Sequence, residues 1–188
     1  DRKMNVGMIS LRWLPEALAL ADEGAHLIDL YTNTSWDGWA KTVSLGGTVT
    51  WESWCANLNN DSMSHPWGAV GLLAMEQYML GIQSVMPQHE LIRIKPLDFG
   101  GKLTYVRGTL PTDKGDISIY WTRSNNDFSM KVNLPDNITA KIYVPRGDSK
   151  DELILVDGTK VAGKVEGNYL YVDHIGSGLH FFERKSNK

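Results

Sequence analysis

Lys102-Leu-Thr-Tyr-Val-Arg-Gly-Thr-Leu-Pro-Thr-Asp-Lys-Gly-Asp-Ile-Ser-Ile-Tyr-Trp-Thr122 contains two segments of strand-like composition separated by turn residues. Residues 102–110 and 115–122 are rich in Val, Ile, Tyr and Thr, a composition typical of β-strands. Between them, Pro111-Thr-Asp-Lys-Gly115 consists largely of turn-forming residues. The stretch therefore predicts two strands joined by a turn.

The sequence on both sides of these two strands has the same pattern of strand-forming runs and turn residues. Further strands are predicted at residues 91–95, 127–134, 139–144, 169–172 and 176–182. Asp157-Gly158 and Glu166-Gly-Asn168 mark later hairpins. Short strands at regular spacing, separated by turn signals, are typical of an antiparallel β-sandwich. We therefore predict that residues 89–188 form a sandwich domain.

The first 88 residues follow a helical pattern instead. Helices are predicted at residues 6–22, 25–31, 36–43 and 66–80, with a β-like segment at 48–51 and a polar loop at 57–64. Pro15 would kink the first helix or displace its start. Ser35 resembles an N-cap for the third helix, and Gly81 is expected to end the last one.

These helices have broad apolar faces and irregular connections, which makes them a poor domain alone. We expect them to be a piece of a larger all-α body. Their apolar surface should then be covered by an upstream part of the parent chain, by a second copy in a homodimer or by the sandwich. The chain as a whole is therefore predicted to be an α+β multidomain fragment, helical over residues 1–88.

Composition excludes several classes of function. The net charge of −3 argues against nucleic acid as a partner, because phosphate binding needs a basic patch. No apolar run reaches the roughly 18 residues that a membrane span needs, so no membrane partner is expected. A single cysteine, Cys55, excludes an internal disulfide. His89, His174 and His180 lack metal-ligand spacing, and neither a metal nor another cofactor is predicted.

The segment Gly46-Gly-Thr-Val-Thr-Trp-Glu-Ser-Trp54 carries the best candidate for catalysis. Glu52 stands between two tryptophans in sequence, and a carboxylate partly removed from water by indoles can serve as a general base. Composition alone also allows an ordinary surface glutamate. His65 opens the next predicted helix, where it could bind a substrate hydroxyl or simply cap and pack the helix.

Six of the seven tryptophans lie before residue 68, and four of them stand in segments rich in Gly, Thr and Ser. Indoles on irregular segments often line clefts, and their flat faces suit the apolar faces of sugar rings, although core packing is the alternative for each one. The four residues are Trp36, Trp39, Trp51 and Trp54.

The order of several motifs resembles the C-terminal third of bacterial α-L-rhamnosidases of glycoside hydrolase family 78. The motifs are Val6-Gly-Met-Ile-Ser-Leu-Arg-Trp-Leu-Pro-Glu-Ala-Leu18, Ser35-Trp-Asp-Gly-Trp39, Gly46 to Trp54 as quoted above, Ser64-His-Pro-Trp-Gly-Ala69, Leu80-Gly-Ile82, Ile94-Lys-Pro96 and Gly108-Thr-Leu-Pro-Thr-Asp-Lys-Gly115. This resemblance covers nearly the whole chain. It implies the last hairpins of an (α/α)6 barrel, followed by the family's carboxy-terminal β-sandwich.

The resemblance also implies a reaction. Family members invert configuration with two carboxylates, and Glu52 matches their general base, which takes a proton from the attacking water. His65 matches a histidine that binds the rhamnose ring, Trp51 and Trp54 would wall the sugar subsite, and Trp36 is expected to contact substrate. The implied substrate is a rhamnose-containing glycoside, and no cofactor is involved.

Two departures from the family pattern leave other functions open. The family's general acid lies in an acidic segment well upstream that this sequence lacks, so we expect the chain alone to have little or no activity. Met63-Ser-His-Pro66 departs from the aromatic-rich variants of the family. The alternatives are a carbohydrate-binding or structural accessory module, and an (α/α)6 glycosidase with a different sugar specificity.

Overall fold

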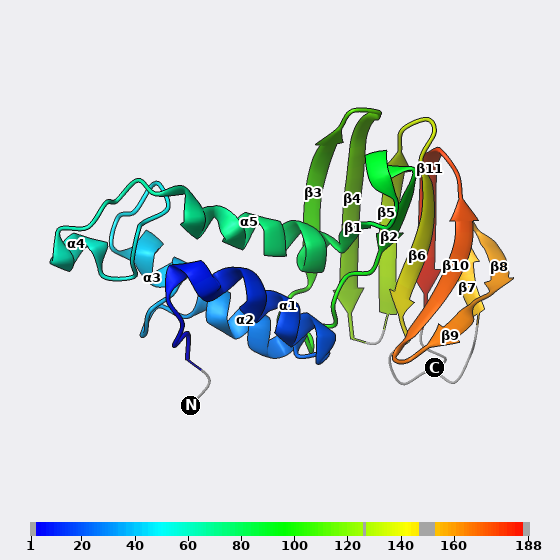
Figure 1. The fold of residues 1–188 in the computed structure, drawn as a ribbon. Coiled ribbons are helices and arrows are strands. Elements are labelled where there is room, and N and C mark those ends of the chain that lie inside the picture. Colours follow the sequence, from blue (N-terminus) through cyan, green and yellow to red (C-terminus); the bar gives the residue numbers. More distant parts are fainter. Residues whose placement is uncertain (1–2, 126, 147–152, 186–188) are drawn as a thin grey trace. The chain divides into compact units, whose positions relative to one another are not determined.

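A computed structural model describes residues 3–125, 127–146 and 153–185 (Figure 1). The chain forms two compact units: a helical unit, Asp1–Met75 with Asp98–Lys102, and a sheet-rich unit, Glu76–Leu97 with Leu103–Lys188. The order of helices first and strands second confirms the predicted fold class. The predicted domain boundary near residue 88 concerns the domains of the parent protein and stays a prediction.

The helical unit consists of short elements around a small core. Its helices are η1 (Met8–Arg12), α1 (Trp13–Leu20), α2 (Gly24–Thr32), α3 (Trp39–Ser44), α4 (Ala56–Asn59), η2 (Pro66–Ala69) and α5 (Val70–Ala74). Because the α-helical part of the first helix begins only at Trp13, Pro15 lies in its first turn, where its missing N–H costs little. Met8, Leu11, Leu30 and Trp54 form the buried core.

Three local predictions in this unit were wrong. Ser35 is not an N-cap: α3 begins after Gly38, and the Ser35 N–H donates to Oδ1 of Asn33 at 2.7 Å. Residues 48–51 form no strand, because this segment has no continuous neighbouring strand to complete a ladder. The predicted loop at 57–64 contains most of α4, a single helical turn.

The helix predicted at residues 66–80 changes type along its length. It starts as η2, continues as α5 and ends as the π-helix η3 (Met75–Leu80). Gly81 ends it with a φ of +85°, as predicted. A Cβ atom at this position would lie 2.3 Å from the backbone nitrogen of Pro96, so only glycine fits between the helix end and the chain that passes it.

The sheet-rich unit contains two sheets, which confirms the predicted sandwich. Its strands are β1 (Ile82–Ser84), β2 (Leu91–Ile94), β3 (Tyr105–Thr112), β4 (Gly115–Ser124), β5 (Asp127–Leu134), β6 (Thr139–Pro145), β7 (Leu153–Val156), β8 (Thr159–Ala162), β9 (Lys164–Glu166), β10 (Tyr169–Ile175) and β11 (Gly178–Arg184), with the short helix η4 (Pro87–His89) after β1. The strand orders are β1-β2-β6-β10-β9 and β3-β4-β5-β11-β7-β8. The described pairings are antiparallel except that between β2 and β6, which is parallel.

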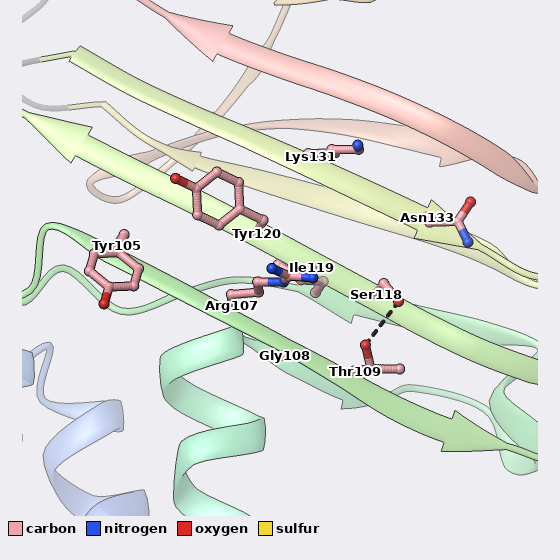
Figure 2. Close-up of a pocket in the computed structure, with 9 residues that line it drawn as sticks. All are labelled: Tyr105, Arg107, Gly108, Thr109, Ser118, Ile119, Tyr120, Lys131 and Asn133. Carbon is pink, nitrogen blue, oxygen red and sulfur yellow. Dashed lines mark hydrogen bonds between the residues drawn. The ribbon is translucent and has the colours of Figure 1, made fainter.

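Burial alternates along the strands and places the core between the two sheets. In β5, Phe128, Met130, Val132 and Leu134 are buried, whereas Lys131 and Asn133 between them are exposed. This alternation leaves an outer face on β3, β4 and β5 that carries polar and aromatic side chains (Figure 2). No helix within the described ranges is long and apolar enough to cross a membrane.

Candidate active site

Two pairs of contacts close the loop at residues 50–67, which carries the predicted catalytic residue Glu52 and the predicted substrate-binding residue His65. Glu52 and Ser62 bond reciprocally: the Glu52 N–H donates to the Ser62 carbonyl, and the Ser62 N–H donates to Oε2 of Glu52, both at 2.8 Å. Nearer the ends of the loop, the His65 N–H donates to the Thr50 carbonyl at 2.7 Å, and the Thr50 hydroxyl donates to the His65 carbonyl at 2.5 Å. These bonds hold the segments before and after α4 together.

Glu52 is half-buried and held through one side of its carboxylate. Oε2 accepts the Ser62 N–H, and no other hydrogen bond to this carboxylate forms in the part of the chain that the structure describes. The other carboxylate in the loop, Asp61, accepts a hydrogen bond from the Ser53 hydroxyl at 2.7 Å. Glu52 therefore combines a fixed position with an oxygen, Oε1, that is open to a water molecule.

His65 is brought close to Glu52 through a neighbouring indole. The His65 ring lies over that of Trp67, with centroids 4.1 Å apart. The Trp67 indole N–H donates to the backbone carbonyl of Glu52 at 3.0 Å, and this side chain is 39% exposed. Neither Trp67 nor Ser62 was predicted as a site residue. Trp67 follows His65 by two positions in a quoted motif, whereas nothing in the sequence indicates the bond from Ser62.

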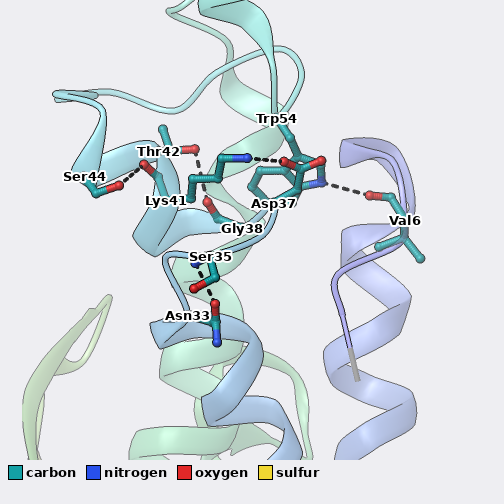
Figure 3. Close-up of polar contacts among 9 residues, drawn as sticks. All are labelled: Val6, Asn33, Ser35, Asp37, Gly38, Lys41, Thr42, Ser44 and Trp54. Atoms are coloured by element: carbon teal, nitrogen blue, oxygen red, sulfur yellow. Dashed lines mark hydrogen bonds and ion pairs between the residues drawn. The ribbon is translucent and has the colours of Figure 1, made fainter. Parts of the chain in front are cut away.

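The structure places Trp51 and Trp54 in the interior of the helical unit. They are 4% and 9% exposed, and both line an apolar cavity of 270 Å³, to which Glu52 and His65 do not contribute. The Trp54 indole donates to the Val6 carbonyl at 3.0 Å (Figure 3). Trp39 also lines this cavity and meets Trp54 edge-on at 5.4 Å.

Trp36 is half-buried, with the ammonium of Lys3 5.9 Å from its ring centroid. Its indole N–H is buried and has no hydrogen-bond acceptor among residues 3–125, 127–146 and 153–185. No hydrogen bond or ring contact joins it to Glu52 or His65 within those ranges. The structure thus brings together Glu52 and His65, and the substrate roles predicted for the three other residues stay predictions.

An exposed ion pair lies in α3 and the segment before it. Lys41 donates to Asp37 at 3.0 Å, four residues earlier (Figure 3). The hydrogen bond with Asp37 and the charge of Asp37 raise the pKa of the Lys41 ammonium. Lys41 therefore serves as the cation of an ion pair and not as an acid or base.

Family models match both parts of the chain. Residues 1–76 match the six-hairpin glycosidase domain of bacterial α-L-rhamnosidases, and residues 81–155 match the C-terminal domain of the same enzymes. Among curated proteins, the chain is 25% identical over 157 residues to an α-L-rhamnosidase of Alteromonas sp. strain LOR, covering 77% of this chain and 16% of that protein. A Formosa agariphila α-L-rhamnosidase is 26% identical over 159 residues, covering 80% of this chain and 17% of that protein.

Solved structures show the same fold. An α-L-rhamnosidase from Dictyoglumus thermophilum superimposes on 97% of this chain with a TM-score of 0.86 at 20% identity, which involves 21% of that protein. The Streptomyces avermitilis α-L-rhamnosidase, crystallised with L-rhamnose, covers 98% with a TM-score of 0.85 at 22% identity, which involves 18% of that protein. The chain thus spans about a fifth or less of the length of these relatives.

Proposed function

Because this chain belongs to the bacterial α-L-rhamnosidase family, we propose that its parent protein hydrolyses glycosides that end in α-L-rhamnose. In this proposal, Glu52 is the general base. The observation that carries it is the anchoring of the Glu52 carboxylate by the Ser62 N–H, which fixes one oxygen and leaves the other open to water. A base must be held within hydrogen-bond reach of the proton that it accepts.

The proposed reaction inverts the anomeric configuration. Glu52 takes a proton from water as the water oxygen attacks the anomeric carbon, and an acid from the upstream part of the parent protein protonates the leaving oxygen. Inverting enzymes hold the two carboxyl groups about 6.5–9.5 Å apart, which leaves room for the water. His65 and the exposed Trp67 would contact the sugar, because a histidine N–H can bind a hydroxyl and an indole face can cover the apolar side of a pyranose.

The decisive experiment is Glu52→Gln in the parent protein. Glutamine keeps an oxygen that can accept the Ser62 N–H, so the loop should keep its shape while the base is lost. We expect turnover of a nitrophenyl α-L-rhamnoside to fall by about 10²–10⁴-fold while the substrate still binds. Asp61→Asn is the matched control, because it removes the other carboxylate of the same loop. Near-normal turnover by the Glu52 variant would exclude the base role.

We also propose that the 188-residue chain alone has little or no activity. The helical unit carries many exposed apolar side chains, which supports its being covered by the upstream part of the parent protein. These include Ile9, Trp13, Leu20, Val43, Leu58 and Leu72. Robust hydrolysis of a nitrophenyl rhamnoside by the purified chain would contradict this proposal. A stable dimer of the chain in solution would instead support a second copy as the covering partner.

A further inference from the structure

A hollow of 610 Å³ lies on the outer face of the sheet-rich unit, over β3, β4 and β5 (Figure 2). Strand register puts its side chains in two adjacent rows. Arg107 pairs with Tyr120, which pairs with Lys131, and the neighbouring row contains Thr109, Ser118 and Asn133. The volume is within the range of about 300–1,000 Å³ that small-molecule sites occupy.

The hollow carries two cations and no carboxylate. Arg107 and Lys131 line it, and neither forms an ion pair within the described parts of the chain. The Lys131 ammonium also lies 5.6 Å from the centroid of the Phe181 ring on β11. By register, two carboxylates lie near the hollow on this face without lining it. Asp116 stands two residues before Ser118 on β4, and Glu183 stands opposite Ser129 and 3.9 Å from Lys185. In a chain of net charge −3, the lining of this hollow is therefore locally positive.

Two tyrosines with exposed rings lie beside the cations: Tyr120 stands between Arg107 and Lys131 in the register, and Tyr105 precedes Arg107 by two residues on β3. Tyr105 is 64% exposed and Tyr120 is 43% exposed, and both line the hollow. Flat aromatic faces on a rigid sheet suit the apolar faces of pyranose rings, while their hydroxyls remain in water.

The row beside them supplies neutral hydrogen-bonding groups. The hydroxyls of Thr109 and Ser118 lie 3.0 Å apart and bond to each other, and the Asn133 amide follows in register. Together these groups offer donors and acceptors at the spacing of neighbouring strands, about 4.8 Å. Sugar hydroxyls both donate and accept, so they fit such a row better than a purely anionic ligand would.

We propose that this hollow binds an acidic carbohydrate, with a uronate carboxylate between Arg107 and Lys131 and a sugar ring over Tyr105 or Tyr120. Charge complementarity favours this occupant, because a neutral saccharide would leave both cations unpaired. The site lies entirely on the sheet-rich unit and does not involve Glu52 or His65. It would hold an uncleaved, acidic part of a polysaccharide. This proposal does not depend on the proposed rhamnosidase activity.

The test measures binding of tetragalacturonate to the 188-residue chain by calorimetry or NMR titration at low salt. Its carboxyl-reduced, neutral counterpart is the comparison probe. We expect measurable binding of the acidic probe only, weakened about tenfold or more by Arg107→Gln and by Lys131→Gln. Lys160→Gln is the matched control: it removes one positive charge from an exposed position of β8, in the same sheet and outside the hollow. Unchanged circular dichroism establishes that the variants fold.

Several outcomes would overturn the proposal. Absence of binding, equal binding of the neutral probe, or equal weakening by Lys160→Gln would each exclude an acidic-sugar site here. Equal affinity for a single-stranded oligonucleotide would indicate a general polyanion surface. Binding by the isolated chain that is lost in the full parent protein would show that another part of that protein occupies this face.

Discussion

Ser62 donates its backbone N–H to the carboxylate of Glu52 and accepts the Glu52 N–H at its own carbonyl, both at 2.8 Å. The two residues are ten positions apart, and α4 lies between them. A backbone donor cannot rotate away as a side chain can, so it fixes the carboxylate in one orientation. This bond supports the proposal that Glu52 is the general base.

Ser62→Pro in the parent protein should lower kcat, because it removes the N–H that orients Glu52. A hydrogen bond to a charged group contributes about 1.5–3 kcal/mol, which corresponds to a loss of roughly 10- to 100-fold in turnover. Ser62→Ala is the control, since it removes the hydroxyl contacts to Ser64 and keeps the N–H. Equal kcat values for the two variants, at equal thermal stability, would show that the backbone bond has no catalytic role.

Glu76→Gln should stabilise the chain at neutral pH. Burial raises the pKa of the Glu76 carboxyl, and the charge of His89 opposes this only in part. Since the folded state binds the proton more tightly than the unfolded state, stability falls as pH rises through the window above the unfolded pKa of about 4.3. The variant should therefore melt at a higher temperature than the wild type at pH 7, and the difference should shrink toward pH 4. The exposed Glu90→Gln provides the control. A gain that is independent of pH would contradict the assigned cause.

Asp157→Asn should destabilise the β7–β8 hairpin in a pH-dependent way. His180 Nδ1 lies 2.9 Å from one carboxylate oxygen of Asp157, and the Phe181 N–H donates to the other at 2.7 Å. The bond with His180 and then that with Phe181 hold the Asp157 pKa below its usual value. The stabilisation is therefore present above the unfolded pKa and lost as pH falls through the folded one. Because the pair is largely exposed, we expect a decrease of only about 1–3 °C in Tm at pH 6. Melting curves from pH 6 to 2 should converge, and a constant difference would refute the linkage.

Gly81→Ala should disrupt the sheet-rich unit. The residue has a φ of +85°, and an added Cβ would lie 2.3 Å from the Pro96 nitrogen and 2.4 Å from the Lys95 carbonyl carbon. Because both atoms belong to the backbone, the clash cannot be relieved by a rotamer change, and we expect a loss of about 3 kcal/mol or more. Gly158→Ala is the matched control, with a φ of +80° and open space around the new atom. Its loss should be about 1 kcal/mol, from backbone strain alone. Similar urea midpoints for both variants would show that the predicted clash is absent.

Local pattern predicted the sandwich better than the helical part. The strands at residues 115–122 and 127–134 were found within two residues of their observed ends, because alternation and turn residues are local signals. The same signals do not reveal the parallel pairing of β2 with β6, which joins segments about 48 residues apart in sequence. In the helical unit, residues 48–51 have strand-like composition but lack a continuous partner strand.

The amino-acid sequence was enough to predict helices followed by strands and, through the order of its motifs, the resemblance to the α-L-rhamnosidase family. The folded structure was needed to show which tryptophans are buried, that Trp67 contacts both His65 and Glu52, and that the Ser62 N–H binds the Glu52 carboxylate. It also decided that Arg107 and Lys131 share an outer face. The reason is physical: periodicity and turn chemistry act over a few residues, whereas burial and side-chain pairing depend on which distant segments the fold brings together.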